Sequence, residues 1–418
     1  MATEIQEFKF LQLSDLHLDS AYLGTRLGLS QSQRYERTRE MLESLFKAVQ
    51  ESQRRGVDAV VIPGDLFDLD TVTGPTMSYV ADIFGRLGQI PVIIAPGNRD
   101  HHGPASLYNS AVLNARGLPL WPANVHIFDS SEPSLIHHPY RADVSFTGRA
   151  FLSPDPTENR FLAQPLPKNE QAAFNILLFH GFLEGYAGPD SAHPEKYSAP
   201  FSVDELEAQG FTFAALGHCH EFAEVYSSKE ELIGAYAGSF VGRSYEEVGP
   251  RVALFVTCVR QADGRFACSL EPAEFDSRRL YVVGADISGL GDEEMLDEIS
   301  LNVEDQGARA GQDLVYLHLE GSYPPSLNLL SVLEKLRARY YHLHMSDHTR
   351  PDYLGERFDE RTTEWKYIEA MLELKKNAET SFGDGSSDYQ MSGSTVEDAL
   401  YYGLDALRQQ KVNVRNVD

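Results

Sequence analysis

The stretch FKFLQLSDLHLD at residues 8–19 decides the fold, because it joins an apolar run directly to a pair of polar side chains. Residues 8–13 have the length and composition of a buried β-strand. Asp15 and His17 follow at once, and a spacing of two places both side chains on one face of an extended segment. A strand that ends in a carboxylate and an imidazole predicts a functional site at the edge of a sheet.

Four more motifs repeat this arrangement, each directly after a short apolar run. The runs cover 59–63, 91–96, 174–179 and 211–216, and the motifs read Gly64-Asp65, Gly97-Asn98, His180-Gly181 and Gly217-His218-Cys219-His220. Because ligands collect outside the carboxyl ends of strands in α/β sheets, the motifs are expected to meet at one rim. Cys219, at the alternate position, is expected to face away. The candidate metal ligands are Asp15, His17, Asp65, Asn98, His180, His218 and His220.

Two amphipathic helices are predicted between the first three strands. Residues 31–53 carry apolar side chains at helical spacing and end before Arg54-Arg55-Gly56, which is a stop signal. A second helix is predicted at 75–87, ahead of the third strand. The alternation of strand and helix indicates an α/β fold.

The composition is that of a globular protein, and 418 residues are enough for two or three domains. Three cysteines without framework spacing argue for a reducing compartment, and no apolar run approaches the roughly 18 residues of a membrane span. We therefore expect a cytoplasmic protein that does not bind membranes. The net charge of −26 conflicts with DNA binding by a basic surface, so metal ions, a few basic groups or a partner would have to hold a polyanion.

Three domains are predicted from the order of the patterns. Residues 1–277 hold the strands and motifs, and residues 278–350 repeat a strand, helix, strand, helix order that suggests a small α+β capping domain. Residues 351–418 are expected to form a helical tail, in which a linker at 377–394 rich in Gly, Ser and Asp joins two helices and is flexible. The apolar stripes of these helices either dock on the protein's own body or bind a partner.

Oxygen donors mixed with imidazoles suit manganese, iron or zinc, whereas an all-thiolate site would indicate structural zinc. Two such cations close together generate hydroxide at neutral pH and neutralise charge on a phosphate that is being hydrolysed. Any one of the five motifs taken alone is more often an ordinary core or loop feature, so their order after five strands carries the prediction. The sequence therefore predicts a dinuclear metal hydrolase that acts on phosphate esters.

The ordered set D-x-H, G-D, G-N, H-G and G-H-x-H, spanning Asp15 to His220, resembles the calcineurin-like metallophosphoesterase superfamily. Within it, LQLSDLHLD at 11–19, PGDLFD at 63–68, and AGS at 237–239 followed by EEVG at 246–249 are similar to the SbcD branch. That branch comprises the nuclease subunits of DNA double-strand-break repair complexes and their YhaO-like relatives. The resemblance, strongest over 8–280, implies a β-sandwich of two mixed sheets flanked by helices, with the small capping domain and helical tail added.

The resemblance also implies how the ligands divide between two metals. One metal would be held by Asp15, His17, Asp65 and His220, and the other by Asp65, Asn98, His180 and His218, with Asp65 as the bridge. The family function would be manganese-dependent DNA cleavage by a homodimer working with an ABC-type coiled-coil ATPase such as SbcC; iron, zinc and magnesium are the alternative metals. In many relatives the C-terminal segment binds the ATPase, which favours a partner for the tail.

One position departs from the family pattern. Family members usually carry His after the metal-binding Asn, whereas here Arg99 follows Asn98 in GNRD at 97–100. Arginine cannot donate a proton near neutral pH, but its fork can bind a phosphate oxygen. Water, His101 or His102 would then supply the proton, or the chemistry is slow. Asn98, Arg99 and His218 are expected to steady the phosphate.

Other residues are candidates on weaker grounds. Asp19 and Asp68 are expected to orient metal ligands, or else to be ordinary surface or capping acids. Arg243 is a candidate phosphate contact or a structural ion pair. Tyr197, with His193 in the loop after His180, is a candidate for lining the substrate groove, although loop polar residues are usually just solvated.

Two rivals to the nuclease hypothesis stay open. The acidic surface and Arg99 favour a dinuclear phosphodiesterase or pyrophosphatase on a small or lipid-linked substrate, and GNRD is also similar to the much shorter pyrophosphohydrolases of lipid A synthesis. Alternatively, the chain is a catalytically weak scaffold subunit, with Arg99 as the first sign of decay. Metal content, and competition between polynucleotides and small phosphates, would separate the three hypotheses.

Overall fold

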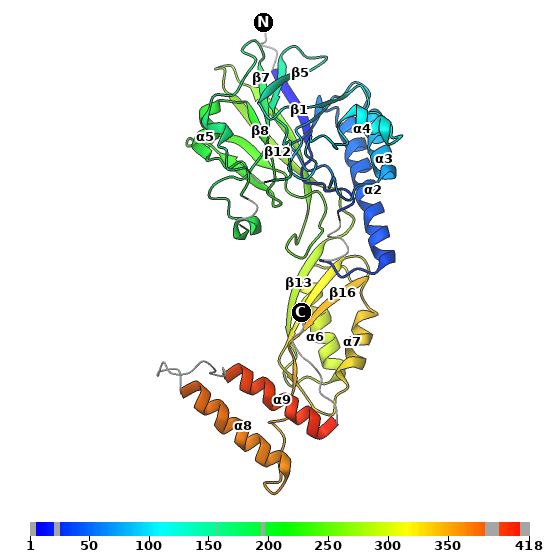
Figure 1. Cartoon of the computed structure of the whole chain (residues 1–418), viewed down its shortest axis with the longest axis vertical. Helices are drawn as coiled ribbons and strands as arrows, with labels where there is room; N and C mark the ends of the chain where they lie inside the picture. The colour runs from blue at the N-terminus through cyan, green and yellow to red at the C-terminus, as the bar shows by residue number, and fades with distance from the viewer. Residues whose placement is uncertain (1–5, 21–25, 156, 194–196, 381–392, 410–418) are drawn as a thin grey trace. The chain divides into compact units, whose positions relative to one another are not determined.

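The computed structural model describes residues 6–20, 26–155, 157–193, 197–380 and 393–409. The chain divides into two compact units, Met1–Leu280 and Tyr281–Asp418, whose elements are labelled in Figure 1. The division lies close to the expected boundary between 277 and 278, and the expected segments 278–350 and 351–418 lie almost wholly in the second unit. All seven candidate ligands belong to the first unit.

Two six-stranded sheets form the first unit. One has the order β12 (Phe266–Glu274), β11 (Val252–Arg260), β1 (Gln6–Gln12), β2 (Ala59–Ile62), β3 (Val92–Ile94), β4 (Val125–Ile127). The other has the order β5 (Ser134–His137), β6 (Val144–Gly148), β7 (Phe174–His180), β8 (Phe213–Gly217), β10 (Leu232–Tyr236), β9 (Ala223–Tyr226). Because β1 is parallel to β2 but antiparallel to β11, and β10 is parallel to β8 but antiparallel to β9, both sheets are mixed, as predicted.

An apolar core to which both sheets contribute lies between them. Phe10 of β1, Phe146 of β6 and Phe174 of β7 are fully buried in it. Helices α2 (Gln31–Arg55), α3 (Gly74–Gly85) and α4 (Ser110–Ala115) lie on one side of the sandwich, and α5 (Val203–Gln209) lies on the other (Figure 1). Two 3-10 turns, η1 (Phe161–Ala163) and η2 (Pro189–Ala192), complete the unit. The predicted α/β class, with helices flanking the sheets, is confirmed.

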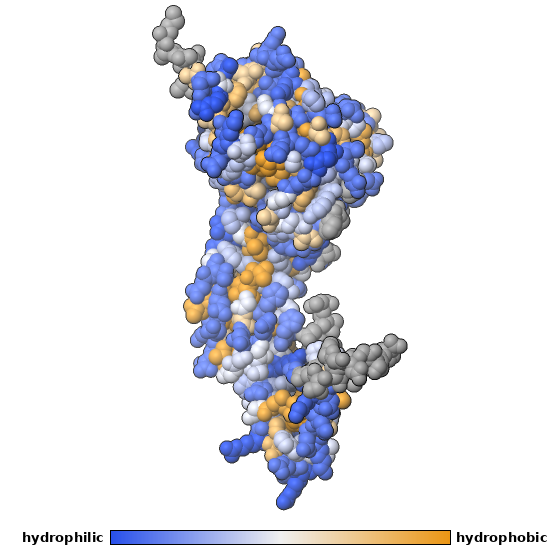
Figure 2. Space-filling view, turned by 90° about the vertical axis from the view of Figure 1, so that its left-hand side faces the viewer, coloured by the Kyte–Doolittle hydropathy of each residue, from blue (hydrophilic) through white to orange (hydrophobic). Residues whose placement is uncertain are grey.

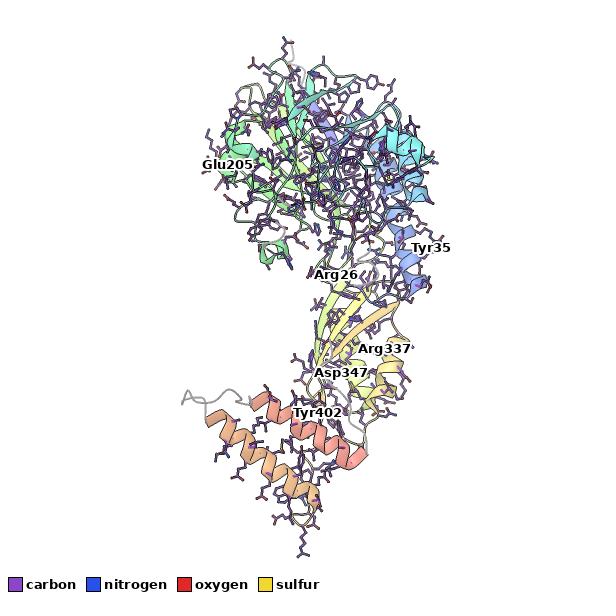
Figure 3. All side chains as sticks on the ribbon, viewed as in Figure 1. Arg26, Tyr35, Glu205, Arg337, Asp347 and Tyr402 are labelled. Atoms are coloured by element: carbon purple, nitrogen blue, oxygen red, sulfur yellow. The ribbon has the colours of Figure 1, made fainter. Side chains whose placement is uncertain are left out.

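Replacing Phe146 by alanine is expected to lower the free energy of unfolding by about 3–5 kcal/mol, because a fully buried ring is lost and a cavity remains. Chemical denaturation followed by circular dichroism measures the change. Tyr35→Ala is the control, since Tyr35 is 77% exposed on α2 (Figure 3) and should change stability by no more than about 0.5 kcal/mol. Equal effects of the two substitutions would contradict the assigned core.

Helix α2 begins and ends at signals that are local in the sequence. The Ser30 hydroxyl accepts the N–H of Gln33, and the Gln33 side chain accepts the N–H of Ser30, which together form a capping box. At the other end Gly56 has a φ of 64°, a left-handed conformation that costs glycine little. The helix predicted at 31–53 is confirmed, with its end at Arg55.

Gln12, the last residue of β1, ties the two sheets together beside the polar motifs. Its buried Nε2 donates to the carbonyl oxygens of Leu216 in β8, at 3.1 Å, and of Ala235 in β10, at 2.9 Å. Asp15 follows shortly after Gln12, and His218 follows shortly after Leu216. Because these hydrogen bonds hold the ends of β1 and β8 together, motifs carried by different sheets reach the same place.

The second unit is built on a three-stranded sheet of β13 (Leu280–Asp286), β14 (Leu314–Glu320) and β16 (His342–Asp347). Helices α6 (Asp292–Asp305) and α7 (Leu329–Arg337) share its apolar core, and β15 (Ser322–Tyr323) pairs with β17 (Arg350–Pro351). Strand β16 lies outside the predicted strands, because histidine and serine alternate with its apolar residues. Figure 2 shows apolar side chains in separate groups between hydrophilic ones on the face it draws.

The tail consists of α8 (Thr363–Thr380) and α9 (Gly393–Gln409). Their apolar stripes meet in a cluster that contains Ile368, Leu400 and Leu404, while Leu372 and Leu407 are 43% and 48% exposed. Of the expected flexible linker, 377–380 belong to α8 and 393–394 to α9, and 381–392 lie outside the described residues. Within the described ranges, none of the helices has the length and hydropathy required to cross a bilayer.

Candidate metal centre

Sharp turns after the strands carry the polar motifs. Asp15, His17, Asp65 and His218 have φ values of 48°, 45°, 54° and 101°, in the left-handed region that such residues rarely adopt. The N–H groups of Asp15 and His17 donate to the carbonyl oxygens of Gly64 and Asp65, at 3.3 and 2.9 Å. The expectation of an extended D-x-H segment is therefore wrong, because contacts with the neighbouring turn impose a left-handed backbone. Strain of this kind persists where the surrounding structure holds it, typically at functional sites.

Three imidazoles are held by hydrogen bonds at Nδ1. The pairs are His17 Nδ1 with Asp68 Oδ1 at 2.7 Å, His180 Nδ1 with the Pro63 carbonyl oxygen at 2.9 Å, and His220 Nδ1 with Glu247 Oε1 at 2.9 Å. Because all three partners are acceptors, Nδ1 is the protonated nitrogen in each ring. Nε2 then keeps its lone pair, as in a histidine that binds a metal.

The carboxylate of Asp65 lies between two groups of candidate ligands. Its Oδ2 is 3.5 Å from His17 Nε2 and 3.6 Å from His180 Nε2, too far for good hydrogen bonds. His17 Nε2 is buried and has no hydrogen-bond partner among the described residues. These separations suit a carboxylate and imidazoles that share cations, and the donor types suit divalent transition metals. The residues present therefore fit two metals with Asp65 between them.

The other candidates complete the two groups. Asp15 Oδ1 is 4.0 Å from His17 Nε2 and 3.9 Å from His220 Nε2, on one side of Asp65, and the Asp15 carboxylate also lies within 4.8 Å of ligand atoms of Asp65 and His180. On the other side, His180 Nε2 is 3.0 Å from Asn98 Oδ1 and 3.2 Å from His218 Nδ1. The structure thus brings all seven residues together, and their role as ligands stays a prediction. Cys219 lies in the apolar cluster on the far face of β8, as expected.

Burial shifts the pKa values of these groups. It raises the pKa of Asp15 to about 6, and it raises that of Asp65 well above its usual range with help from the Asp100 and Asp15 carboxylates. Burial, followed by the positive charge of Arg243, lowers the pKa of His17 to about 3. The His17 imidazole is therefore neutral near pH 7, as a metal ligand must be, and the raised pKa of the Asp65 carboxyl favours a proton that a cation would displace.

Metal affinity is expected to rise as the pH rises through about 6. Asp15, with its pKa raised to about 6, must lose a proton to bind a cation, whereas His17 is already neutral there. Below the Asp15 pKa the affinity should fall by up to about tenfold per pH unit for each proton displaced. Calorimetric titration of chelator-treated protein with manganese between about pH 5 and 8, in two buffers of different protonation enthalpy, measures affinity and proton release. An affinity that does not change with pH would contradict the ligand role of Asp15.

Asp100, which sequence reasoning did not single out, joins two of the motifs. Its carboxylate accepts the N–H groups of Asp65, Leu66 and Gly97 at 3.1, 2.8 and 2.6 Å. It also accepts the Tyr108 hydroxyl at 2.6 Å. An aspartate three residues after Gly97 is a local signal for this role, because short acidic side chains cap the N–H groups of nearby turns.

Two further acids hold His220, and local spacing does not predict either of them. Asp190 Oδ2 accepts the N–H of His220 at 2.7 Å, and Glu247 accepts from His220 Nδ1. Arg243 donates from Nη2 to the same Glu247 oxygen at 2.7 Å and is 2% exposed. The arginine is therefore in a structural ion pair, which was one of its two expected roles, and it is not placed to meet phosphate from solvent.

The candidate acids Asp68 and Asp19 have different surroundings. Burial favours the protonated form of Asp68, but the hydrogen bond from His17 Nδ1 and the positive charges of Arg243 and Arg99 hold the Asp68 pKa below its usual range. Asp19 instead accepts the N–H of Thr73 at 2.9 Å, just before α3. The backbone of Asp19 is left-handed, with a φ of 58°. Asp19 thus holds the backbone of Thr73, the N-cap residue of α3, whose own hydroxyl caps the helix.

The loop candidates are spread more widely. Arg99 donates its backbone N–H to Asp65 Oδ1 at 2.9 Å, and its side chain is 41% exposed. His101 has a buried Nδ1 without a hydrogen-bond partner in the described part of the chain. Tyr197 donates its hydroxyl to the Ser191 carbonyl oxygen at 2.9 Å, and its ring lies 4.2 Å from that of Phe182. Arg99 is therefore hydrogen-bonded to the candidate metal ligand Asp65, whereas Tyr197 is hydrogen-bonded within its own loop.

Residues 8–222, which include all five motifs, match the sequence pattern of the calcineurin-like phosphoesterases. The chain belongs to that family. YhaO of Bacillus subtilis (strain 168), an uncharacterized metallophosphoesterase, is 28% identical over 253 residues, which are 59% of this chain and 56% of that one. The DNA double-strand break repair protein Mre11 of Nanoarchaeum equitans (strain Kin4-M) is 24% identical over 224 residues, 50% of this chain and 56% of that one. This phosphoesterase thus spans little more than half the length of the curated relatives it matches.

Solved structures are also similar to part of this calcineurin-like phosphoesterase. A dimetal phosphatase from Danio rerio is 14% identical with a TM-score of 0.36, and the match covers 63% of this chain and 98% of that one. The protein TT1561 of Thermus thermophilus is 12% identical with a TM-score of 0.35, and the match covers 65% of this chain and 100% of that one.

Proposed function

We propose that this phosphoesterase hydrolyses phosphodiester bonds in DNA at a site that holds two divalent cations. Manganese is the first choice, with iron, zinc and magnesium as alternatives. The observation that carries the proposal is the position of Asp65 Oδ2, 3.5 Å from His17 Nε2 and 3.6 Å from His180 Nε2, since this suits a carboxylate shared by two metals. The similarity to an archaeal DNA double-strand break repair protein supports a polynucleotide substrate.

The chain's own residues are assigned the positioning of the phosphate. When bound, the two cations would supply Lewis acidity and a nucleophilic hydroxide at neutral pH. Asn98 and His218, both beside His180, are the groups that steady the phosphate under attack. His101 is the candidate proton donor to the leaving oxygen, because its Nδ1 has no hydrogen-bond partner in the described residues.

Arg99 is expected to bind a phosphate oxygen rather than transfer a proton. Its backbone is fixed by Asp65, its Nε is 3.7 Å from Asp68 Oδ1, and its side chain is 41% exposed. Arg99→Gln should raise KM for DNA about tenfold with a smaller change in kcat, as steady-state kinetics would measure. Arg116→Gln is the matched control, because Arg116 is exposed at the end of α4. If the two variants behave alike, Arg99 has no such role.

We also propose a cytoplasmic homodimer whose tail binds an ABC-type coiled-coil ATPase of the SbcC kind. Leu372 and Leu407 on the tail helices are partly exposed and offer apolar surface to a partner. The net charge of −26 also favours a partner that supplies basic surface for DNA.

The test is cleavage of single-stranded, duplex and hairpin DNA with Mn²⁺, by the chain alone and together with the ATPase. We expect cleavage that a chelator stops and that Mn²⁺ restores. Failure on every DNA substrate, with the ATPase present and two metals bound, would overturn the proposal.

A second candidate function is hydrolysis of a small or lipid-linked phosphodiester or pyrophosphate. The strongly acidic composition and Arg99 favour it, since a small substrate does not require a basic surface. Competition between DNA, nucleotides and lipid-linked diphosphates separates the two candidates. A chain that binds two metals but cleaves neither class would be the catalytically weak scaffold.

A further inference from the structure

Arg149 is a buried cation that the described residues leave without hydrogen bonds at two of its nitrogens. It directly follows Gly148, the last residue of β6, and is 7% exposed. Nε and Nη1 are both buried and have no hydrogen-bond partner among the described residues. The guanidinium lies instead against aromatic rings, 3.4 Å from the centroid of Phe161 and 4.9 Å from that of Phe151. Burying a charge without hydrogen bonds costs free energy, so this position calls for an explanation.

The four other buried arginines among the described residues are all paired with carboxylates. These pairs are Arg37 with Asp276 at 2.5 Å, Arg243 with Glu247 at 2.7 Å, Arg251 with Glu221 at 2.7 Å and Arg278 with Glu40 at 2.6 Å. Burial lowers the pKa of Arg149 to about 10, and the exposed carboxylate of Glu132 counters only part of that effect. Arg149 therefore differs from the other four in having no carboxylate partner among the described residues, whereas its two unbonded nitrogens are a feature that it shares with Arg243, whose Nε and Nη1 also lack hydrogen bonds there.

Phe151 connects Arg149 to the candidate metal centre. Its ring meets the ring of His180 edge to face, with the centroids 5.6 Å apart. Its N–H donates to the carbonyl oxygen of Pro96, next to the Gly97-Asn98 motif, at 3.0 Å. Strand β6 is also parallel to β7, which ends at His180, so Arg149 emerges at the same edge of the sheet. One aromatic ring thus separates this guanidinium from a candidate metal ligand.

We propose that Arg149 binds a second phosphate group of the substrate, adjacent to the phosphate that the metal centre hydrolyses. A phosphodiester has two free oxygens that match the fork of a guanidinium, and charge-assisted hydrogen bonds would replace those that Arg149 lacks. The ring of Phe161 lies against the Arg149 guanidinium and must move aside for an anion to reach it. Phe161 is half-buried on η1 and follows an exposed stretch at 158–160, which gives it room to move. A polynucleotide as the source of this phosphate rests on the proposed DNA function; free inorganic phosphate offers the same chemistry.

Kinetics on two substrates test the subsite. Arg149→Met should lower kcat/KM for an oligonucleotide about tenfold relative to kcat/KM for bis(p-nitrophenyl) phosphate, which has a single phosphate. The loss should lie mainly in KM. Arg265→Met is the matched control and should leave this ratio unchanged, since the exposed Arg265 pairs with Asp263 on the surface. A ratio that Arg149→Met leaves unchanged would overturn the proposal.

Thermal denaturation separates binding from a purely structural role. Methionine in place of an unpaired buried cation should keep or raise the Tm, whereas an arginine needed only for packing would lower the Tm when replaced. Inorganic phosphate should raise the Tm of the wild-type chain more than that of Arg149→Met. The proposal would be wrong if phosphate raised the Tm of both proteins equally. It would also be wrong if Arg149→Met lowered the Tm and left the ratio of the two kcat/KM values unchanged. If the wild type cleaves no DNA, the proposed function fails, and the phosphate-dependent Tm difference still decides the subsite.

Discussion

Asp65→Ala is expected to reduce the bound metal from about two ions per chain to less than about one, and to lower kcat/KM on any phosphodiester by at least about a thousandfold. The reason is geometric, because Asp65 Oδ2 faces both His17 Nε2 and His180 Nε2, so both metal positions lose a ligand at once. Elemental analysis after manganese loading measures the first effect. Hydrolysis of bis(p-nitrophenyl) phosphate measures the second without assuming a DNA substrate.

Asp70→Ala is the matched control for this experiment. Asp70 is exposed and lies shortly after Asp65, so the same substitution there removes a carboxylate that faces solvent. Its metal content and activity should equal those of the wild type. The Asp65 variant should keep its far-ultraviolet circular dichroism, because the pKa of this buried carboxyl is raised by burial and the ionised group does not stabilise the metal-free fold. Two metals bound at wild-type affinity in Asp65→Ala would refute the dinuclear centre.

Gly97→Ala should impair the centre without touching a ligand. A Cβ at Gly97 would lie 2.4 Å from Asp65 Oδ1 and 2.8 Å from His180 Cε1, so both side chains would have to move. A displacement on the order of 1 Å in a catalytic group can cost about a hundredfold in rate. We expect kcat to fall by about that factor and metal content to fall with it, as kinetics and elemental analysis would measure.

Gly284→Ala provides the comparison for Gly97→Ala. Gly284 lies in β13, and a Cβ there would meet nothing within 4 Å. Both substitutions replace a hydrogen by a methyl group, so a difference between them reports the space around each residue. Wild-type kcat and metal content in Gly97→Ala would mean that the turn relaxes freely, contrary to the tight packing of Gly97 against Asp65 and His180.

The main strands of the site could be predicted because their signal is local. Runs at 8–13, 59–63, 174–179 and 211–216 correspond to β1, β2, β7 and β8. Short, continuously apolar segments that end in polar residues are typical of strands covered on both faces, and this structure has such strands. Strand β16 was not predicted from the sequence, because polar residues alternate with its apolar ones and it has no continuous apolar run.

The backbone of the motifs could not be predicted in the same way. A spacing of two in Asp15-Leu16-His17 suggested an extended segment, yet both polar residues have positive φ. Their conformation depends on hydrogen bonds to Gly64 and Asp65, which lie in the turn after another strand. The alternation of side chains along residues 15–17 does not show that the turn at Gly64 and Asp65 packs against them.

The sequence by itself determined which side chains are available for metal chemistry and that they follow strand ends, since both depend on residue type and spacing. Only the tertiary structure decided their chemical state. Asp68 and Glu247 select the proton position on His17 and His220, and no carboxylate among the described residues is bound to Arg149. The protonation and pairing of a buried group depend on which atoms reach it from other strands, and those distances exist only after the sheets have packed.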